Sequence, residues 1–197
     1  MTDPLVPAGE GHTPIGDEDR EGLIPTYIAT RGELFAAEEA NIAVATYGLR
    51  PNPSELLDDL YLRRLHQAMF NRVWRWAGRY RTGEVNIGID PADVGIQVRA
   101  LVADANSWVA NASFELDELA VRFHHRLVQI HPFVNGNGRH GRVAADLLIQ
   151  SLGRPAFGWG RGLHLETDDL RGRYQRALQA MDADPDDIES LITFARS

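Results

Sequence analysis

Residues 131–142 read His-Pro-Phe-Val-Asn-Gly-Asn-Gly-Arg-His-Gly-Arg, and they carry more chemical information than any other part of the chain. A loop with two glycines that leads directly into a helix places backbone N–H groups at the positive end of the helix dipole, which is an anion-binding arrangement. Arg139 and Arg142 are three residues apart, so on a helix they share a face and both can reach a bound phosphate. The side chain of Asn137 adds an amide donor.

His131 stands immediately before this loop. Because an unperturbed histidine has a pKa of about 6.5, its side chain can be neutral at pH 7 and can take a proton from a hydroxyl group. Each part alone has a structural explanation: glycines form turns, and arginines at this spacing form ion-paired surfaces. Their combination in one segment favours phosphoryl or nucleotidyl transfer to an alcohol, with Phe133 holding the loop in the core.

The composition excludes several other chemistries. The 197-residue chain has no cysteine, so disulfides, thiolate metal sites and cysteine nucleophiles are excluded. All 20 basic residues are arginine, which excludes a P-loop and lysine Schiff-base chemistry. The net charge is −8, although residues 42–164 hold 14 arginines against 11 acids, a local +3. An acidic chain is not expected to bind nucleic acid broadly.

No apolar run is long enough to span a bilayer, and residues 1–16 lack the pattern of a signal peptide. We therefore expect a cytoplasmic protein that does not enter membranes.

Apolar residues recur at three- and four-residue steps along most of the chain and predict an all-α bundle. Residues 1–30 read as an extended arm. Between residues 80 and 89 a weak alternation with turn glycines predicts a small β-hairpin flap. Besides a helix between the loop and Gly153, the expected helices cover 31–47, 54–78 with Ser54 as N-cap, 98–109, 116–127, 167–181, and 185–195 with Asp184 as cap.

The segment 131–142 resembles the signature of the Fic family, His-Pro-Phe-x-(Asp/Glu)-Gly-Asn-Gly-Arg-x-x-Arg, at every specified position except the fifth. The similarity extends over residues 50–195. It includes the helix and turn before the flap, through Leu65, His66, Phe70, Val73, Trp76, Ala77 and Gly78. Residues 22–25 and 30–34 further resemble a Fic subgroup called mobile mystery protein B.

The resemblance implies an all-α, Fic-fold helical bundle, with residues 1–49 as an arm and first helix and residues 50–197 as the Fic domain. Most members of the family transfer AMP from ATP to a Ser, Thr or Tyr hydroxyl of a target protein. His131 would then be the general base, and Gly136, Asn137 and Gly138 would bind the nucleotide phosphates. Arg139 would pair with the β-phosphate, and Arg142 with the phosphate chain or an inhibitory glutamate.

The flap of such a protein would bind the target as an added strand, a mode that reads backbone rather than sequence. In this chain the resemblance assigns that role to Thr82, Gly83, Glu84, Val85, Asn86 and Ile87.

The departure from the signature is Asn135, which replaces the Asp or Glu that holds magnesium in the family. A neutral amide is a poorer ligand for Mg²⁺ or Mn²⁺ than a carboxylate, so the metal would be held mainly by ATP phosphates and water. The alternatives are a catalytically weak nucleotide-binding or partner-binding module, or transfer of another phosphate-containing group. The family's kinases carry lysine where this chain keeps Gly138, so γ-phosphate transfer ranks lower.

Partners and regulation rest on the subgroup resemblance, which implies a mobile-element, toxin–antitoxin-like setting and a helix-turn-helix regulatory partner. A homo-oligomer is left open. The family's inhibitory pattern, (Ser/Thr)-x-x-x-Glu-(Gly/Asn), is absent from the sequence. Glu33, Glu38 and Glu39 on the first helix could substitute for the inhibitory glutamate, but we interpret them as solvated; inhibition by a separate partner agrees equally with the subgroup resemblance.

Other candidates favour structural roles. His124 and His125 are adjacent with no carboxylate at a helical step, so His124 is interpreted as a packed or hydrogen-bonded residue rather than a metal ligand. The four tryptophans are assigned to the core. Tyr174 is expected near the adenine pocket.

Overall fold

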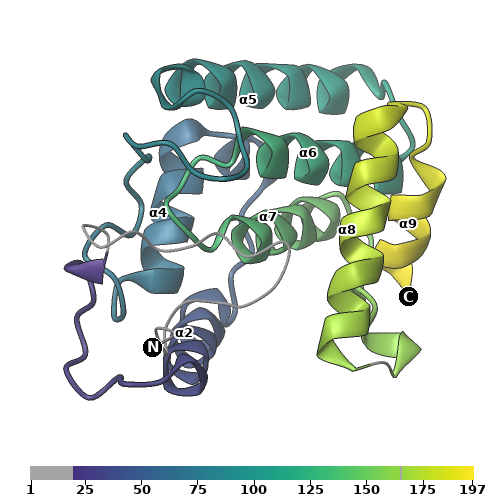
Figure 1. Cartoon of the computed structure of the whole chain (residues 1–197). Helices are drawn as coiled ribbons and strands as arrows, with labels where there is room; N and C mark the ends of the chain where they lie inside the picture. Colours follow the sequence, from purple (N-terminus) through teal and green to yellow (C-terminus); the bar gives the residue numbers. More distant parts are fainter. Residues whose placement is uncertain (1–19, 165) are drawn as a thin grey trace.

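The computed structural model describes residues 20–164 and 166–197, so most of the predicted arm over residues 1–30 lies outside the described residues. The described residues form a helical assembly (Figure 1). Its α-helices are α2 (Arg31–Thr46), α3 (Pro53–Leu56), α4 (Asp59–Phe70), α5 (Val94–Asn111), α6 (Leu116–Ile130), α7 (Asn137–Ser151), α8 (Thr167–Ala183) and α9 (Glu189–Arg196). Two 3-10 turns, η1 (Pro91–Asp93) and η2 (Arg161–Leu163), complete the set.

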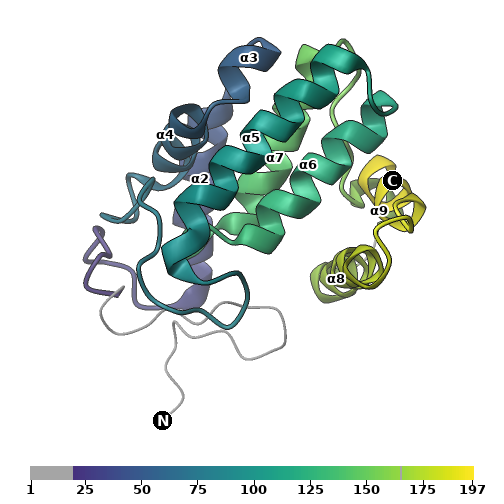
Figure 2. The same ribbon diagram turned by 90° about the horizontal axis from the view of Figure 1, so that it is seen from above.

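Helices α6 and α7 form the centre of the protein. Helix α5 packs along α6, while α2 packs on α4 at the opposite side of the central pair (Figures 1 and 2). Helices α8 and α9 pack on each other beside the central pair. The core between these elements is apolar and closed, as Phe123, Leu127 and Leu148 are all at most 1% exposed. None of the helices in the described ranges is both long enough and apolar enough to cross a membrane.

The first helix follows the prediction closely. Thr30 accepts a hydrogen bond from the Glu33 N–H at 3.3 Å, and the Glu33 carboxylate accepts one from the Thr30 N–H at 2.9 Å, which forms a capping box. Leu34, Glu38 and Asn41 share the buried stripe of this helix. Glu38 is therefore not solvated, contrary to our interpretation of the sequence.

The predicted helix over 54–78 is wrong in its continuity. The chain breaks at residues 57 and 58 because the Asp58 carboxylate caps α4 by accepting from the Tyr61 N–H at 2.8 Å. Asn52, rather than Ser54, caps α3. Helix α4 ends at Phe70, and turns continue to residue 78.

The last helix begins later than predicted. Asp184 lies at the end of α8 and accepts from the Asp186 N–H at 3.0 Å, so a turn at residues 185–186 follows α8 and α9 begins only at Glu189.

The predicted β-hairpin flap is also wrong for this structure. Residues 80–90 contain no strand, and the β-pairing found in the described residues is one isolated bridge between Leu23 and Trp74. The flap carbonyls of Gly83 and Ile89 accept hydrogen bonds from the guanidinium of Arg81 instead of from a facing strand. The segment is therefore an irregular loop closed by a side chain.

Candidate active site

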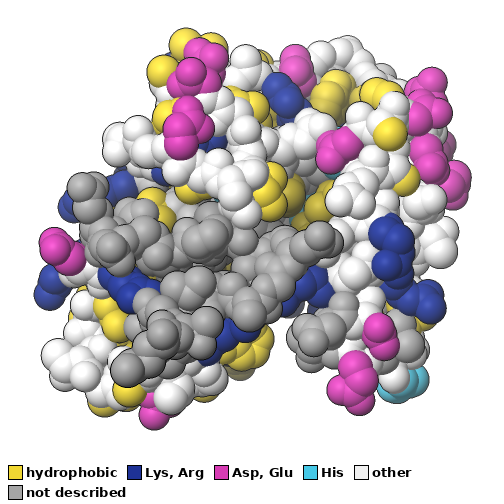
Figure 3. Space-filling model, viewed as in Figure 1, with side chains coloured by type: hydrophobic (Ala, Val, Ile, Leu, Met, Phe, Trp, Pro, Cys, Tyr) yellow, Lys and Arg dark blue, Asp and Glu magenta, His cyan; other side chains and the backbone are white. Residues whose placement is uncertain are grey.

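A cleft of about 1040 Å³ lies between α2 and α8, over the end of α6 and the start of α7. Arginine side chains gather on the surface over α8, and acidic ones gather where α8 gives way to α9 (Figure 3). Every candidate of the segment 131–142 lines the cleft, namely His131, Asn135, Gly136, Asn137, Gly138, Arg139 and Arg142. Among the candidates of the flap, only Ile87 belongs to the lining within the described residues.

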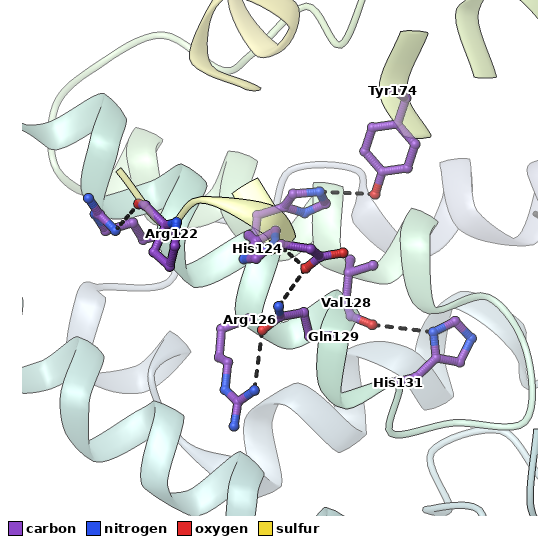
Figure 4. Close-up of polar contacts among 10 residues, drawn as sticks. Arg122, His124, Arg126, Val128, Gln129, His131 and Tyr174 are labelled. Carbon is purple, nitrogen blue, oxygen red and sulfur yellow. Dashed lines mark hydrogen bonds and ion pairs between the residues drawn. The ribbon is translucent and has the colours of Figure 1, made fainter. Parts of the chain in front are cut away.

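His131 ends α6 in the left-handed conformation, with φ 53°. Such a backbone is uncommon for a residue with a side chain and tends to occur at functional positions. Its ring Nδ1 lies 3.3 Å from the Val128 carbonyl, the contact drawn in Figure 4. Because Nδ1–H is the donor in this contact, the lone pair of the neutral ring lies on Nε2.

Burial is the main reason that the pKa of His131 is lowered to about 4. The nearby Arg81 guanidinium lowers it further, while the hydrogen bond to Val128 acts in the opposite direction. The ring is therefore neutral at pH 7, which is the state that a general base requires.

The loop between α6 and α7 is held by buried side chains. Asn137 accepts from the Phe133 N–H at 2.9 Å and donates to the Phe133 carbonyl at 2.8 Å. The oxygen and one N–H of this amide are thus used inside the protein, and the predicted donation to a phosphate stays a prediction for its second N–H. The Phe133 ring stacks on His66 at a centroid distance of 3.7 Å, and Phe133 fills the core as predicted.

His66 connects the loop to the turn after α4. Its Nδ1 accepts from the Gly78 N–H at 3.0 Å, so its Nε2–H donates to the Asn135 carbonyl, also at 3.0 Å. Burial holds the pKa of this ring well below 6.5, which keeps it neutral and suited to this one-donor, one-acceptor role.

The start of α7 is built to meet an anion. Gly136, in the left-handed conformation with φ 79°, is the N-cap residue, and no side chain caps the helix. The first N–H groups of α7 therefore open into the cleft with the positive end of the helix dipole. A β-carbon at Gly136 would lie 2.5 Å from Cζ of Phe70, so only glycine fits here.

The residues present do not form a magnesium site. Oδ1 of Asn135 accepts a hydrogen bond from the Gly136 N–H at 2.5 Å, so the amide is turned onto the loop backbone. No cluster of three His, Cys, Asp or Glu side chains suited to a metal occurs in residues 20–164 and 166–197. The neutral Asn135 amide also lacks the negative charge with which the Asp or Glu of the Fic signature would attract the cation.

The two arginines of the segment face opposite walls of the cleft. Arg139 forms an ion pair with Glu38 of α2, at 2.9 Å between Nη1 and Oε2. Glu39, whose side chain is 48% exposed, is more distant at 3.7 Å. Glu38 is 5% exposed and also accepts from the Trp74 indole N–H at 2.7 Å. The buried Glu38 carboxylate is thus paired with Arg139, the arginine that we expected to bind the β-phosphate.

Arg142 instead faces α8, with its guanidinium 5.2 Å from the centre of the Tyr174 ring. The Tyr174 hydroxyl lies 3.0 Å from Nε2 of His124 (Figure 4). His124 is fully buried, and burial lowers its pKa to about 3, so it is a neutral hydrogen-bonding residue as predicted. A β-carbon at Gly138 would lie 3.7 Å from the Tyr174 hydroxyl, so this hydroxyl lies over the anion-binding loop.

Asp146 lies one turn beyond Arg142 in the same cleft. It accepts from the Trp159 indole N–H at 2.9 Å and from the Phe157 N–H at 3.0 Å. Burial raises its pKa to about 6, despite these hydrogen bonds and the positive charges of Arg142 and Arg161.

A model of the Fic/DOC family matches residues 56–149, which include the loop and both arginines. This part of the chain is a Fic/DOC domain. The protein adenylyltransferase Fic of Nematostella vectensis is 28% identical over 136 residues, covering 65% of this chain and 30% of that protein. Protein adenylyltransferase fic-1 of Caenorhabditis elegans is 35% identical over 86 residues, covering 40% of this chain and 16% of that protein. The chain thus spans less than a third of these relatives.

Solved structures show the same fold. BepC of Bartonella tribocorum, solved with bound AMPPNP, superposes with a TM-score of 0.69 at 15% identity, covering 92% of this chain and 97% of that chain. The prediction of an all-α Fic fold is confirmed, apart from the hairpin flap.

Sequence reasoning missed several residues of this site. Glu38 could have been found, because it shares the spacing of Leu34 and Asn41 on the buried stripe of α2. The link from Tyr174 to His124 and the position of Asp146 depend on how α8 and residues 157–159 fold back over α7. No local pattern encodes such long-range contacts.

Proposed function

We propose that this Fic/DOC domain is a protein adenylyltransferase, which transfers AMP from ATP to a side-chain hydroxyl of a target protein. One observation carries the proposal: a neutral His131 shares one cleft with an uncapped helix N-terminus and two arginines. The naming of matched relatives as protein adenylyltransferases supports it.

In the proposed reaction the hydroxyl oxygen of the target attacks the α-phosphorus of ATP. Its proton passes to Nε2 of His131, the bond from the α-phosphorus to the bridging oxygen breaks, and pyrophosphate leaves. The N–H groups of Asn137 and Gly138 stabilise the charge on the phosphate oxygens, and the N–H of Gly136 joins them once it leaves the Asn135 side chain. Arg142, and Arg139 once released from Glu38, bind the remaining phosphates.

We assign target binding to the flap, residues 82–87, with Ser, Thr and Tyr as the acceptor residues. Ile87 supports this assignment because it brings the flap to the edge of the cleft. Binding of an extended segment along the flap would give its backbone the partner strand that it otherwise lacks.

A second candidate is a nucleotide-binding or partner-binding module with weak catalysis. The Asn135 side chain favours it, since its oxygen is engaged by Gly136 and provides no charge for a cation. Mg²⁺ or Mn²⁺ would then enter already bound to ATP. Transfer of another phosphate-containing group through the same cleft belongs to this second group of functions.

We further propose that Glu38 restrains the domain by competing with phosphate for Arg139, which the ion pair at 2.9 Å supports. A helix-turn-helix regulatory partner in a cytoplasmic, toxin–antitoxin-like system on a mobile element would act on this restraint. Alternatively, formation of a homo-oligomer would control the same Glu38–Arg139 ion pair.

The test is transfer of label from ATP to proteins of a bacterial lysate, with the label on the α-phosphate in one reaction and on the γ-phosphate in another. We expect labelled bands from the α-phosphate alone, and their loss in His131→Ala with ATP binding retained. Label from the γ-phosphate alone would replace the proposal with a kinase. Label from neither would favour the binding module.

A further inference from the structure

Arg81, a residue that is only 3% exposed, joins the flap to the end of α6 through its guanidinium. Its backbone N–H donates to the Pro132 carbonyl at 3.0 Å. Its side chain donates to four more backbone carbonyls, those of Gly83 at 3.1 Å, Ile89, Ile130 at 3.5 Å and His131 at 2.7 Å. One residue therefore binds three consecutive carbonyls at the end of α6 and both ends of the flap.

The partners of this arginine indicate a positioning role. In the described ranges no carboxylate forms an ion pair with Arg81, and burial lowers the pKa of the guanidinium. A buried charge is costly unless its N–H groups are bonded, so the four side-chain contacts hold the guanidinium in one place. Carbonyls at a helix C-terminus are also the negative end of the helix dipole, which favours a cation there.

Gly88 brings the flap against the candidate base itself. Its φ is 123°, and a β-carbon at this position would lie 2.7 Å from Cβ of His131 and 2.9 Å from Nη2 of Arg81. The flap backbone, the base and the guanidinium therefore pack without space for another atom. A shift of the flap must displace either His131 or the Arg81 side chain.

We propose that Arg81 is a positioning residue that fixes the flap and His131 relative to each other, so that a hydroxyl held on the flap meets the base. This proposal rests on the proposed adenylyl transfer. In this proposal the Arg81 side chain aligns the flap with His131, although Arg81 and His131 are 50 residues apart in the sequence.

The positive charge of Arg81 also supports the proposed role of His131 as the base. It lowers the pKa of His131 and so helps to keep the ring neutral. Glu84 and Asp90 are the carboxylates whose charges reach the guanidinium, and they partly offset its charge.

The experiment compares Arg81→Lys and Gly88→Ala with Arg79→Met, an exposed arginine two positions away, as the matched control. Lysine keeps the charge but lacks the planar fork that reaches several carbonyls at once. Gly88→Ala keeps the arginine but places a β-carbon against both His131 and the Arg81 guanidinium, so it disturbs the same packing from the flap. A result from either variant is enough if the other fails to fold.

The first measurement is a nuclear Overhauser contact between Gly88 Hα and His131 Hβ, together with the imidazole signals of His131. We expect the contact in the wild type and in Arg79→Met, and its loss or weakening, with shifted His131 signals, in Arg81→Lys. In Gly88→Ala, shifted His131 signals are the expected result. Unchanged His131 signals in both folded variants would overturn the proposal.

The second measurement is AMP labelling of lysate proteins alongside the Kd for ATP by calorimetry. We expect labelling to fall about 10-fold or more in Arg81→Lys, the effect of losing one well-placed hydrogen bond to a charged group, while the Kd for ATP stays within about twofold. An equal loss of ATP binding would overturn the positioning role. If the wild type labels no protein, the adenylyl transfer fails, and the first measurement still decides the role of Arg81.

Discussion

Removing the charge of Glu38 should strengthen nucleotide binding. In Glu38→Gln the amide oxygen can still accept from the Trp74 indole N–H, which bonds to the carboxylate at 2.7 Å, while the ion pair to Arg139 at 2.9 Å is lost. Two opposite charges about 4 Å apart near a protein surface attract each other by about 4 kcal/mol, and desolvation of the two charges cancels part of this, which leaves roughly 1.5–3 kcal/mol for this ion pair. Because about 1.4 kcal/mol corresponds to a factor of ten, releasing Arg139 to phosphate should tighten ATP binding roughly 10- to 100-fold.

Calorimetric titration with ATP measures this change directly. Glu39→Gln is the matched control, since Glu39 lies 3.7 Å from Arg139 with its side chain 48% exposed, and exposed pairs contribute only about 0–1 kcal/mol. A Glu38→Gln protein that binds ATP no more tightly than the wild type would refute the idea that this ion pair competes with phosphate.

Three further predictions concern the same cleft. Asn135→Asp restores a carboxylate near the bound phosphates and should raise the rate of AMP transfer in the presence of Mg²⁺ by about 10-fold, equivalent to roughly 1.4 kcal/mol. Labelling measures this rate, and equal rates in the variant and the wild type would argue against a missing metal ligand. Asp146, with its pKa raised to about 6 from 3.8, binds a proton in the folded protein that the unfolded chain has released, so its contribution to stability falls as the pH rises from about 4 to about 6. Asp146→Asn removes this decline, and its thermal stability should rise more steeply with pH over that range than the wild type's; parallel curves would contradict the assignment. Gly136→Ala combines φ 79° with a contact of 2.5 Å to Phe70 and should cost about 1–3 kcal/mol more in denaturant unfolding than Gly153→Ala, where φ is 85° but no atom lies within 4 Å.

The helical fold could be predicted because most of it is encoded locally. The apolar spacing in α2, α5, α6 and α7 follows the helical period, and Thr30 and Glu33 mark the start of α2. The break before α4 could not be placed by periodicity, since the apolar steps continue across it. What decides it is the Asp58 side chain, which caps a new helix instead of extending the old one.

The candidate site was predictable in its loop and less so in its surroundings. Residues 131–142 are contiguous, so their spacing alone brings base, glycines and arginines together. The partners that decide what each side chain does come from distant elements. Glu38 of α2 binds Arg139, and Tyr174 of α8 lies beside Arg142. The hairpin prediction was wrong because the Arg81 guanidinium, and not a facing strand, donates hydrogen bonds to the flap carbonyls of Gly83 and Ile89. The alternation of apolar and polar residues does not reveal such a side-chain contact.

The most direct test of the account is the chemical identity of the group transferred in this cleft. Glu38→Gln protein incubated with ATP and lysate should yield target peptides heavier by one AMP, with one pyrophosphate released for each AMP transferred. The double variant Glu38→Gln, His131→Ala should bind ATP as tightly and transfer none, because only the base is removed. Undiminished transfer in the double variant would contradict His131 as the base, and peptides that carry a single phosphate would contradict adenylyl transfer.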